Sequence, residues 1–168
     1  MHHVDASAAC PSCGRPGKSV APLTVVSLLT DDARGRTNRT DGFRFCREAA
    51  CAVTYFQPDT GLSFTKQDVR VRVGSKESTS PRPVCYCFGH SVEDIEHDVA
   101  RTGDSGIPAA IAERCRQGLA RCEETNPQGA CCLGDVHRAV RHAQDQLRGT
   151  AAIAEDVRDD CRRSRGSA

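Results

Sequence analysis

Cysteine is the residue of this chain best suited to chemistry, with eleven copies in 168 residues. The first four form a C-x2-C pair, Cys10 and Cys13, and a C-x4-C pair, Cys46 and Cys51. Two such pairs supply four thiolates, the ligand set of a closed structural zinc site. The alternative, unliganded cysteines used as small apolar side chains, fits poorly with the polar, turn-like surroundings of Cys10, Cys13 and Cys51. The spacing therefore predicts a zinc site.

A second group of cysteines lies between residues 85 and 132. It opens with a C-x-C pair, Cys85 and Cys87, and closes with Cys122 and the adjacent Cys131 and Cys132. Four thiolates in two separated pairs suit an iron-sulfur cluster. Either of the adjacent cysteines could complete the set. We choose Cys132, since it can cap a following helix, and predict a [2Fe-2S] cluster here.

Turns and helix starts should position this second group. Side chains alternate along an extended chain, so a C-x-C pair reaches one iron only from a bent loop, and Gly89 provides for the bend. Ser91 and Asp94 have the spacing of a capping box at the start of a helix. An anionic cluster is favoured beside the positive end of a helix dipole. A turn at residues 126–129 precedes the last pair.

Other possible ligands are less well placed. Cys115 and Cys161 fall at helical spacing and are expected to be core residues, although with Cys131 they could bind cuprous ion transiently, because thiolates select soft metals. Four histidines could replace cysteine on iron, as in a Rieske site, but none has the required spacing: His90, His97, His137 and His142. His2 and His3 belong to an expected flexible tail.

The composition indicates a thin core. Aromatic residues make up 4% of the chain and Trp is absent, so we expect metal centres to act as staples. No segment has the apolar length of a membrane span or the pattern of a secretion signal, which predicts a cytoplasmic, reducing location. A net charge of +1 argues against a nucleic-acid or membrane surface.

The hydrophobic pattern predicts an α+β chain, in which a small zinc-stapled β module is followed by a helical module. We expect strands within residues 20–29, 52–56 and 64–73. Helices should begin near Val92 and Pro108, the second carrying Cys115, Leu119 and Cys122 on one side. A third helix from Leu133 to Leu147 should be followed by a separate fourth piece. The expected divisions are a tail at 1–9, the β module at 10–73, a linker at 74–83, the helical module at 84–147 and a charged helical tail at 148–168.

Four segments together resemble one known family. The segments at residues 10–14, 45–56, 84–89 and 126–134 are similar, in the same order, to the amino-terminal zinc and [2Fe-2S] domain of the CopZ copper chaperones, whose cluster half is BFD-like, similar to bacterioferritin-associated ferredoxin. The resemblance implies zinc ligands at Cys10, Cys13, Cys46 and Cys51. It implies cluster ligands at Cys85, Cys87, Cys122 and Cys132. It also implies reduction of cupric to cuprous ion, although no Met-x-Cys-x2-Cys segment of a copper-carrying domain is present.

Two functions follow as hypotheses. The first is a cytoplasmic electron carrier or metal-reducing module in the trafficking of copper or another soft metal, with a metal-trafficking or redox protein as partner. The second is an iron-sulfur sensor or scaffold that docks a partner through its charged carboxy-terminal helix. A homodimer fits either. The chain shows no Ser/His/Asp order, phosphate loop or paired carboxylates, so we expect no catalytic residues beyond metal reduction. A zinc-ribbon nucleic-acid binder would need a basic face that this chain lacks.

Overall fold

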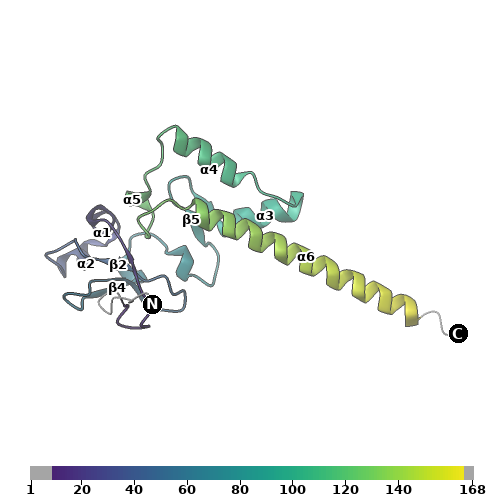
Figure 1. Ribbon diagram of the computed structural model, residues 1–168, viewed down its shortest axis with the longest axis horizontal. Helices are drawn as coiled ribbons and strands as arrows, with labels where there is room; N and C mark the ends of the chain where they lie inside the picture. Colours follow the sequence, from purple (N-terminus) through teal and green to yellow (C-terminus); the bar gives the residue numbers. More distant parts are fainter. Residues whose placement is uncertain (1–8, 165–168) are drawn as a thin grey trace, which may run out of the picture.

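The computed structural model describes residues 9–164, and side chains as far as residue 151 (Figure 1). The architecture is mixed α/β: a sheet with short helices is followed by a helical half from which one long helix projects. The first half contains β1 Lys18–Ser19, α1 Pro22–Leu28, α2 Asp31–Gly35, β2 Arg44–Phe45, β3 Val53–Phe56, β4 Ser63–Thr65 and the 3-10 turns η2 Lys66–Asp68 and η3 Gly74–Lys76. The second contains β5 Pro83–Cys85, β6 His90–Ser91, α3 Val92–Thr102, α4 Ile107–Arg116, α5 Cys122–Thr125 and α6 Leu133–Ser164.

The first half is built on a four-stranded antiparallel sheet in the order β1-β2-β3-β4. Phe45 pairs with Tyr55 across β2 and β3, and Tyr55 pairs with Phe64 across β3 and β4. These three rings are fully buried, and they pack with aliphatic side chains of α1 in one core. Most of the few aromatic residues of the chain therefore lie in the buried core beside this sheet.

Two of the expected strands are wrong. Residues 22–28 form α1, because Pro22 suits the first helical turn and the buried Val25 and Leu28 lie three residues apart on one helix face. The expected strand over residues 64–73 ends at Thr65, where a capping box between Thr65 and Asp68 starts η2. The expected strand over residues 52–56 is confirmed as β3.

The helical half packs α3 and α4 against the first turns of α6. Its core contains Ile95 and Val99 of α3, Ile111 of α4, and Val136 and Val140 of α6. The expected capping box at the start of α3 is confirmed, with the Ser91 hydroxyl accepting from the backbone N–H of Asp94 at 3.2 Å. The helix ends where predicted, at Gly103, whose φ of 83° is the left-handed conformation that favours glycine.

Two helix boundaries differ from the predictions. Helix α4 ends at Arg116, so Leu119 is not on its face but 51% exposed, and Cys122 begins the separate helix α5. Helix α6 continues without a break from Leu133 to Ser164, where two pieces were expected. Its 32 residues span roughly 48 Å at 1.5 Å per residue, and its second half extends beyond the rest of the chain (Figure 1). Within the described residues no helix is long and apolar enough to cross a membrane.

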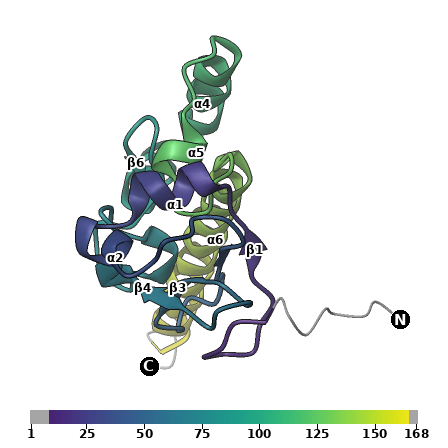
Figure 2. The ribbon, with the colours of Figure 1, turned by 90° about the vertical axis from the view of Figure 1, so that its left-hand side faces the viewer.

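Direct contacts join the two halves. The Tyr55 hydroxyl donates to the carbonyl of Pro127 at 2.7 Å, and both groups lie inside the structure. Helix α1 lies against α5 (Figure 2). At the adjacent turn, a Cβ on Gly129 would lie 2.8 Å from the Thr24 hydroxyl, so only glycine fits.

The segment at residues 74–83, predicted as a linker, is partly packed. Gly74 and Lys76 are buried in η3, and a Cβ on Gly74 would lie 1.9 Å from the carbonyl oxygen of Pro83. The Tyr86 hydroxyl accepts from the backbone N–H of Gly74 and donates to the carbonyl of Arg72, both at 2.9 Å. The domain boundaries stay predictions, but this stretch connects the halves through fixed contacts. Of the predicted tail at 1–9, only Ala9 is among the described residues, and it pairs with Pro16.

Candidate metal centres

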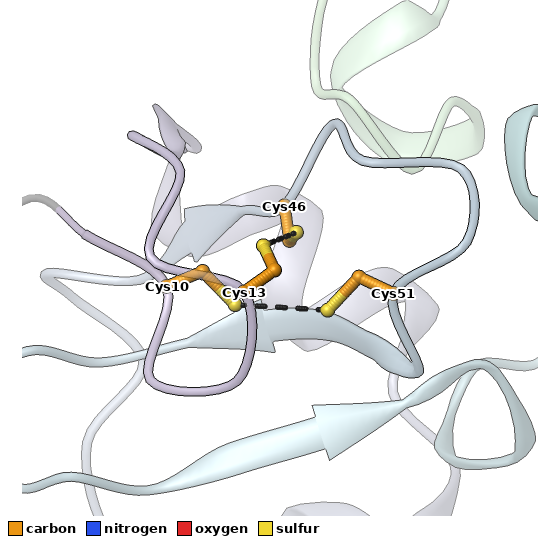
Figure 3. Close-up of side chains that lie close together, drawn as sticks. All are labelled: Cys10, Cys13, Cys46 and Cys51. Carbon is orange, nitrogen blue, oxygen red and sulfur yellow. Dashed lines mark hydrogen bonds between the residues drawn. The ribbon is translucent and has the colours of Figure 1, made fainter.

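The first cysteine set converges on one point in the β half (Figure 3). The sulfur atoms of Cys10 and Cys51 are 3.8 Å apart, and those of Cys13 and Cys46 are 3.6 Å apart. All four sulfurs lie within 4.8 Å of one another. Such a compact set of four sulfurs is the donor set of a single tetrahedral ion, and zinc fits it.

Tight turns next to the sheet supply these four side chains. Cys10 and Cys13 flank a turn closed by the Gly14 N–H donating to the Cys10 carbonyl at 2.8 Å. Cys46 directly follows β2, and Cys51 stands two residues before β3. Because Phe45 and Val53 are buried beside them, the sheet fixes the spacing of the last two sulfurs.

The thiols of this set differ in acidity. Burial raises the pKa of Cys46 to about 12. Burial also opposes ionisation of Cys51, but hydrogen bonds from the Val53 backbone and from Ser12 and Cys13 outweigh it and lower its pKa to about 7. One thiolate is therefore readily formed near neutral pH, and an incoming ion would displace the remaining protons.

A lysine that sequence reasoning missed lies beside this centre. Lys76 is 8% exposed, and its ammonium donates to the carbonyls of Glu48 at 2.8 Å and Cys51 at 3.1 Å. Its charge favours the ionised form of Cys46. The sequence gives no sign of this role, because Lys76 stands in a polar stretch without periodicity.

The second cysteine set contains one close pair and two cysteines buried in a common core. The sulfurs of Cys87 and Cys122 are 3.5 Å apart. Cys85 and Cys132 are buried in the same core cluster, where the Cys132 thiol lowers the pKa of Cys85 to about 7 and the Cys85 thiol raises that of Cys132. In the part of the chain that the structure describes, these four sulfurs do not form a group all within 4.8 Å of one another, unlike the first set. The second set is therefore less compact than the first.

The elements around the second set match the expected turns. The C-x-C loop bends at Gly89, whose φ is 74° and whose N–H donates to the Cys85 carbonyl at 2.9 Å. The Cys87 sulfur accepts from the backbone N–H of Arg121 at 3.2 Å. Cys132 directly precedes α6, where its carbonyl accepts from the N–H of Val136 at 2.9 Å. Cys132 is 2% exposed and lies in the same buried cluster as Cys85, whereas Cys131 is exposed.

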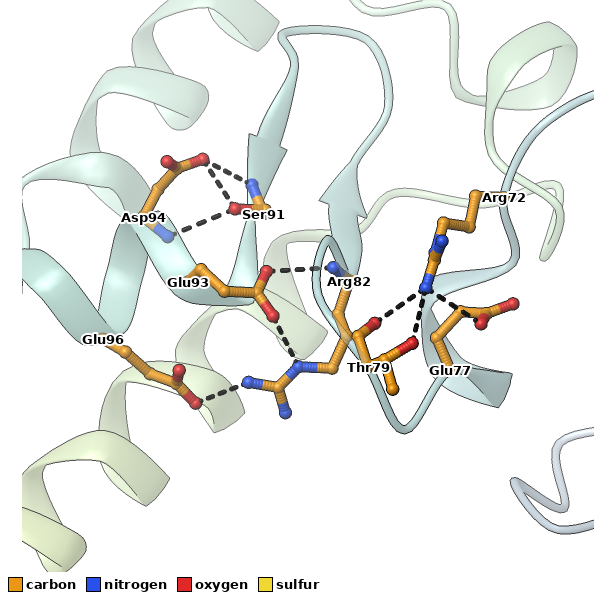
Figure 4. A network of polar contacts seen from close by, with 8 residues as sticks. All are labelled: Arg72, Glu77, Thr79, Arg82, Ser91, Glu93, Asp94 and Glu96. Carbon is orange, nitrogen blue, oxygen red and sulfur yellow. Dashed lines mark hydrogen bonds and ion pairs between the residues drawn. The ribbon is translucent and has the colours of Figure 1, made fainter.

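An arginine clamp fixes the start of the C-x-C loop (Figure 4). The Arg82 guanidinium donates to the carboxylates of Glu93 at 2.7 Å and Glu96 at 2.8 Å on α3. The Arg82 backbone N–H also donates to Glu93, at 2.9 Å. These side chains are about two-thirds shielded from solvent, so water competes little with their hydrogen bonds. The clamp therefore connects β5, which contains Cys85, to the start of α3.

The remaining candidates have separate locations. Cys115 is half-buried against the helical core, and the side chain of Cys161 lies outside those described. His2 and His3 also lie outside the described residues. The first cysteine set is the one compact group of three or more His, Cys, Asp or Glu ligand atoms within the described part, so no described histidine belongs to such a group.

Comparisons with known proteins match this architecture. A family model described as a zinc binding domain, zf_CopZ, matches residues 7–70. The copper chaperone CopZ of Archaeoglobus fulgidus is 34% identical over 131 residues, which cover 77% of this chain and 60% of that protein. The X-ray structure of the N-terminal domain of that CopZ superimposes with a TM-score of 0.62 at 31% identity, covering 77% of this chain and 95% of the domain.

Proposed function

Because this chain belongs to the family of CopZ N-terminal domains, we propose that it is a zinc and [2Fe-2S] protein that exchanges single electrons in copper handling. The family model of a zinc binding domain matches the β half, and the compact four-cysteine site lies in that half. The cluster, the electron-transfer role and the BFD-like character of the helical half are the proposed part. A metal-trafficking or redox protein is the proposed partner.

One observation carries the proposal: in the described part of the chain, the second cysteine set combines the close Cys87–Cys122 pair with the buried Cys85 and Cys132, without the single compact group that the first set forms. In a [2Fe-2S] cluster each iron takes two thiolates, so the four ligands divide into two pairs on opposite sides. A single zinc ion instead needs four sulfurs around one point, as in the first set. The contrast between the two sets supports a different centre at Cys85, Cys87, Cys122 and Cys132.

The proposed ligands have different surroundings. Cys85 and Cys132 are buried, whereas Cys87 and Cys122 are partly exposed. The Arg121 N–H and the Thr125 hydroxyl, 3.2 Å from the Cys87 sulfur, supply polar contacts on the exposed side. Hydrogen bonds to ligand sulfur and exposure to solvent both raise the potential of such a centre. Because Cys87 is partly exposed and the buried ligands are not, we expect electrons to enter and leave the cluster beside Cys87.

The first set has a structural role in this proposal. Cys10, Cys13, Cys46 and Cys51 would hold zinc, which in small peptides contributes about 10 to 16 kcal/mol to folding at neutral pH. That exceeds the whole stability of many domains. The zinc would fix the turns around the sheet. The hydrogen bond from Tyr55 to Pro127 would in turn fix the turn before Cys132 against that sheet.

The test is electron transfer to cupric ion. When bound, the cluster supplies one-electron exchange, so about one cupric ion per chain should return the chemically reduced protein to its oxidised visible spectrum. Reading the spectrum of the cluster separates its electron from electrons that free thiols give to cupric ion. A Cys122→Ser variant, which removes a proposed cluster ligand but no zinc ligand, should lack this spectral change while keeping its zinc. A reduced wild-type spectrum that does not change on addition of cupric ion would contradict the proposal.

The second candidate function, docking of a partner, is favoured by the projecting part of α6 (Figure 1). From Asp145 to Ala151 every side chain is exposed, so this helical segment packs on nothing within the described chain. Truncation after Gln144 should abolish capture of a partner while leaving the visible spectrum intact. If the truncated chain still binds that partner with full affinity, the docking function is wrong.

A further inference from the structure

A groove with two ends lies between the two halves of the chain. It consists of two cavities, of about 180 and 190 Å³, which are continuous because they share four lining residues: Phe45, Ser75, Gln128 and Asp135. The β half contributes Phe45 of β2, and the helical half contributes Ala139 of α6. Among the described residues no cysteine lines the groove, so it is separate from both cysteine sets.

The inner end of the groove is apolar. This end has a volume of about 180 Å³, and its apolar lining residues are Val73, Pro83, Val84, Val92, Pro127 and Ala139. The Tyr86 hydroxyl and the Asn126 amide also border it, but both are already hydrogen-bonded to backbone groups. An apolar cavity of about 150 Å³ is large enough to bind benzene. The inner end therefore accommodates one ring or a branched aliphatic group.

The outer end of the groove carries an excess of positive charge. Two arginines line it, Arg47 and Arg138, against one carboxylate, that of Asp135. Arg138 donates to this carboxylate, and the side-chain amide of Gln128 donates to it at 3.1 Å. Arg47 is exposed and pairs with no carboxylate within residues 9–151. The outer end therefore has one cation available for a ligand.

The charge and the chemistry of Arg47 indicate which anion suits this end. The planar guanidinium binds a carboxylate through two parallel hydrogen bonds. A phosphate monoester carries about 1.5 to 2 negative charges near neutral pH, more than one free arginine balances. A carboxylate carries a single charge and matches it.

We propose that the groove between the halves binds a small monocarboxylate whose apolar body is about the size of a phenyl ring. The body occupies the inner end, and the carboxylate accepts hydrogen bonds from the Arg47 guanidinium. The site contains no metal ligand, so it does not depend on the proposed electron-transfer function. Because both halves line the groove, a bound ligand should also raise the unfolding temperature of the chain.

The experiment is a calorimetric titration of the full, metal-loaded chain, together with thermal unfolding. The probes are benzoate, phenylacetate and 3-phenylpropionate, which differ in the distance between ring and carboxylate. We expect at least one of them to bind and to raise the unfolding temperature. The amide of that acid has nearly the same shape without the charge, so it should bind about fivefold more weakly, the upper contribution of an exposed charge pair. Acetate, which lacks the ring, should give no binding.

Two variants test the two ends separately. Arg47→Gln should reduce the affinity for the acid to that for the amide. Because Arg47 is exposed and has no ion pair among the described residues, this variant should fold normally. Ala139→Leu should fill the inner end and abolish binding of both acid and amide, with zinc content and unfolding midpoint as checks of its fold. Arg101→Gln is the matched control, since Arg101 is an exposed arginine of α3 that does not line the groove.

Four results would overturn the site: no binding of any of the three acids, equal affinity of wild type for acid and amide, unchanged affinity in Arg47→Gln, or full binding by folded Ala139→Leu. The proposed function fails separately. A protein without iron that binds the acid through Arg47 would keep this site and contradict only the cluster, whereas an iron-containing protein that binds none of the acids would do the reverse.

Discussion

Replacing Lys76 by methionine should weaken the first metal centre, although Lys76 contributes no ligand. The ammonium makes two hydrogen bonds, to the carbonyls of Glu48 and Cys51, and is almost fully buried. Hydrogen bonds from a charged group contribute about 1.5 to 3 kcal/mol each, against which stands the cost of burying the ammonium. Methionine preserves the apolar stem but leaves both carbonyls unpaired. We expect a net loss of about 2 to 4 kcal/mol.

That loss should appear in zinc affinity, since the Glu48–Cys51 loop carries a ligand and the lysine charge balances the thiolates. A change of about 1.4 kcal/mol is tenfold, so zinc should bind roughly 30- to 1000-fold more weakly. The assay is competition for zinc with a chromophoric chelator, together with thermal unfolding. Lys66→Met is the matched control, because Lys66 is 44% exposed and its ion pair with Glu77 contributes about 0 to 1 kcal/mol. Equal zinc affinities for the two variants would refute the reasoning.

Three further predictions concern two contacts between the halves and the arginine clamp within the helical half. Gly74→Ala should cost about 1 to 3 kcal/mol, measured by chemical denaturation, because its Cβ would overlap the Pro83 carbonyl; an unchanged midpoint would contradict this. Tyr55→Phe leaves the buried carbonyl of Pro127 without its donor, so calorimetry should show about 1 to 3 kcal/mol lost, whereas wild-type stability would mean that the contact is dispensable. Partial burial opposes ionisation of Glu93, but hydrogen bonds from the facing arginine outweigh it and lower its pKa from 4.5 to about 2. The contribution of Glu93 is therefore present above pH 4.5 and lost as the pH falls toward 2, so the stability difference from Glu93→Gln should shrink over that range; a constant difference would exclude the clamp as its source.

Local signals predicted α3 well. The Ser91–Asp94 capping box and Gly103 act on their own neighbours in the chain, so they fixed both ends of α3 from sequence alone. The membership of the CopZ family was also predicted, from four short segments, and is confirmed. The pairing of Cys10 and Cys13 with Cys46 and Cys51 followed from the same kind of short-range spacing.

Non-local contacts explain what sequence reasoning missed. Residues 20–29 are apolar enough for a strand, but α1 forms, and its buried residues pack in the core of the sheet while the helix also contacts α5. Residues 74–83 look like a linker by composition, yet Lys76 is buried by carbonyls of the distant Glu48–Cys51 loop. In both cases the partners come from far along the chain, so the segment alone does not reveal them.

The most direct test of the central claim is native mass spectrometry of anaerobically purified protein and two serine variants. Wild type should carry the mass of about one zinc, two irons and two sulfides. Cys131→Ser should keep these metals and sulfides, and Cys132→Ser should lose the irons and sulfides while retaining zinc, since Cys132 is buried in one cluster with Cys85 and Cys131 is exposed. A wild-type protein that carries zinc alone, or a Cys132→Ser variant that keeps both irons, would contradict the account.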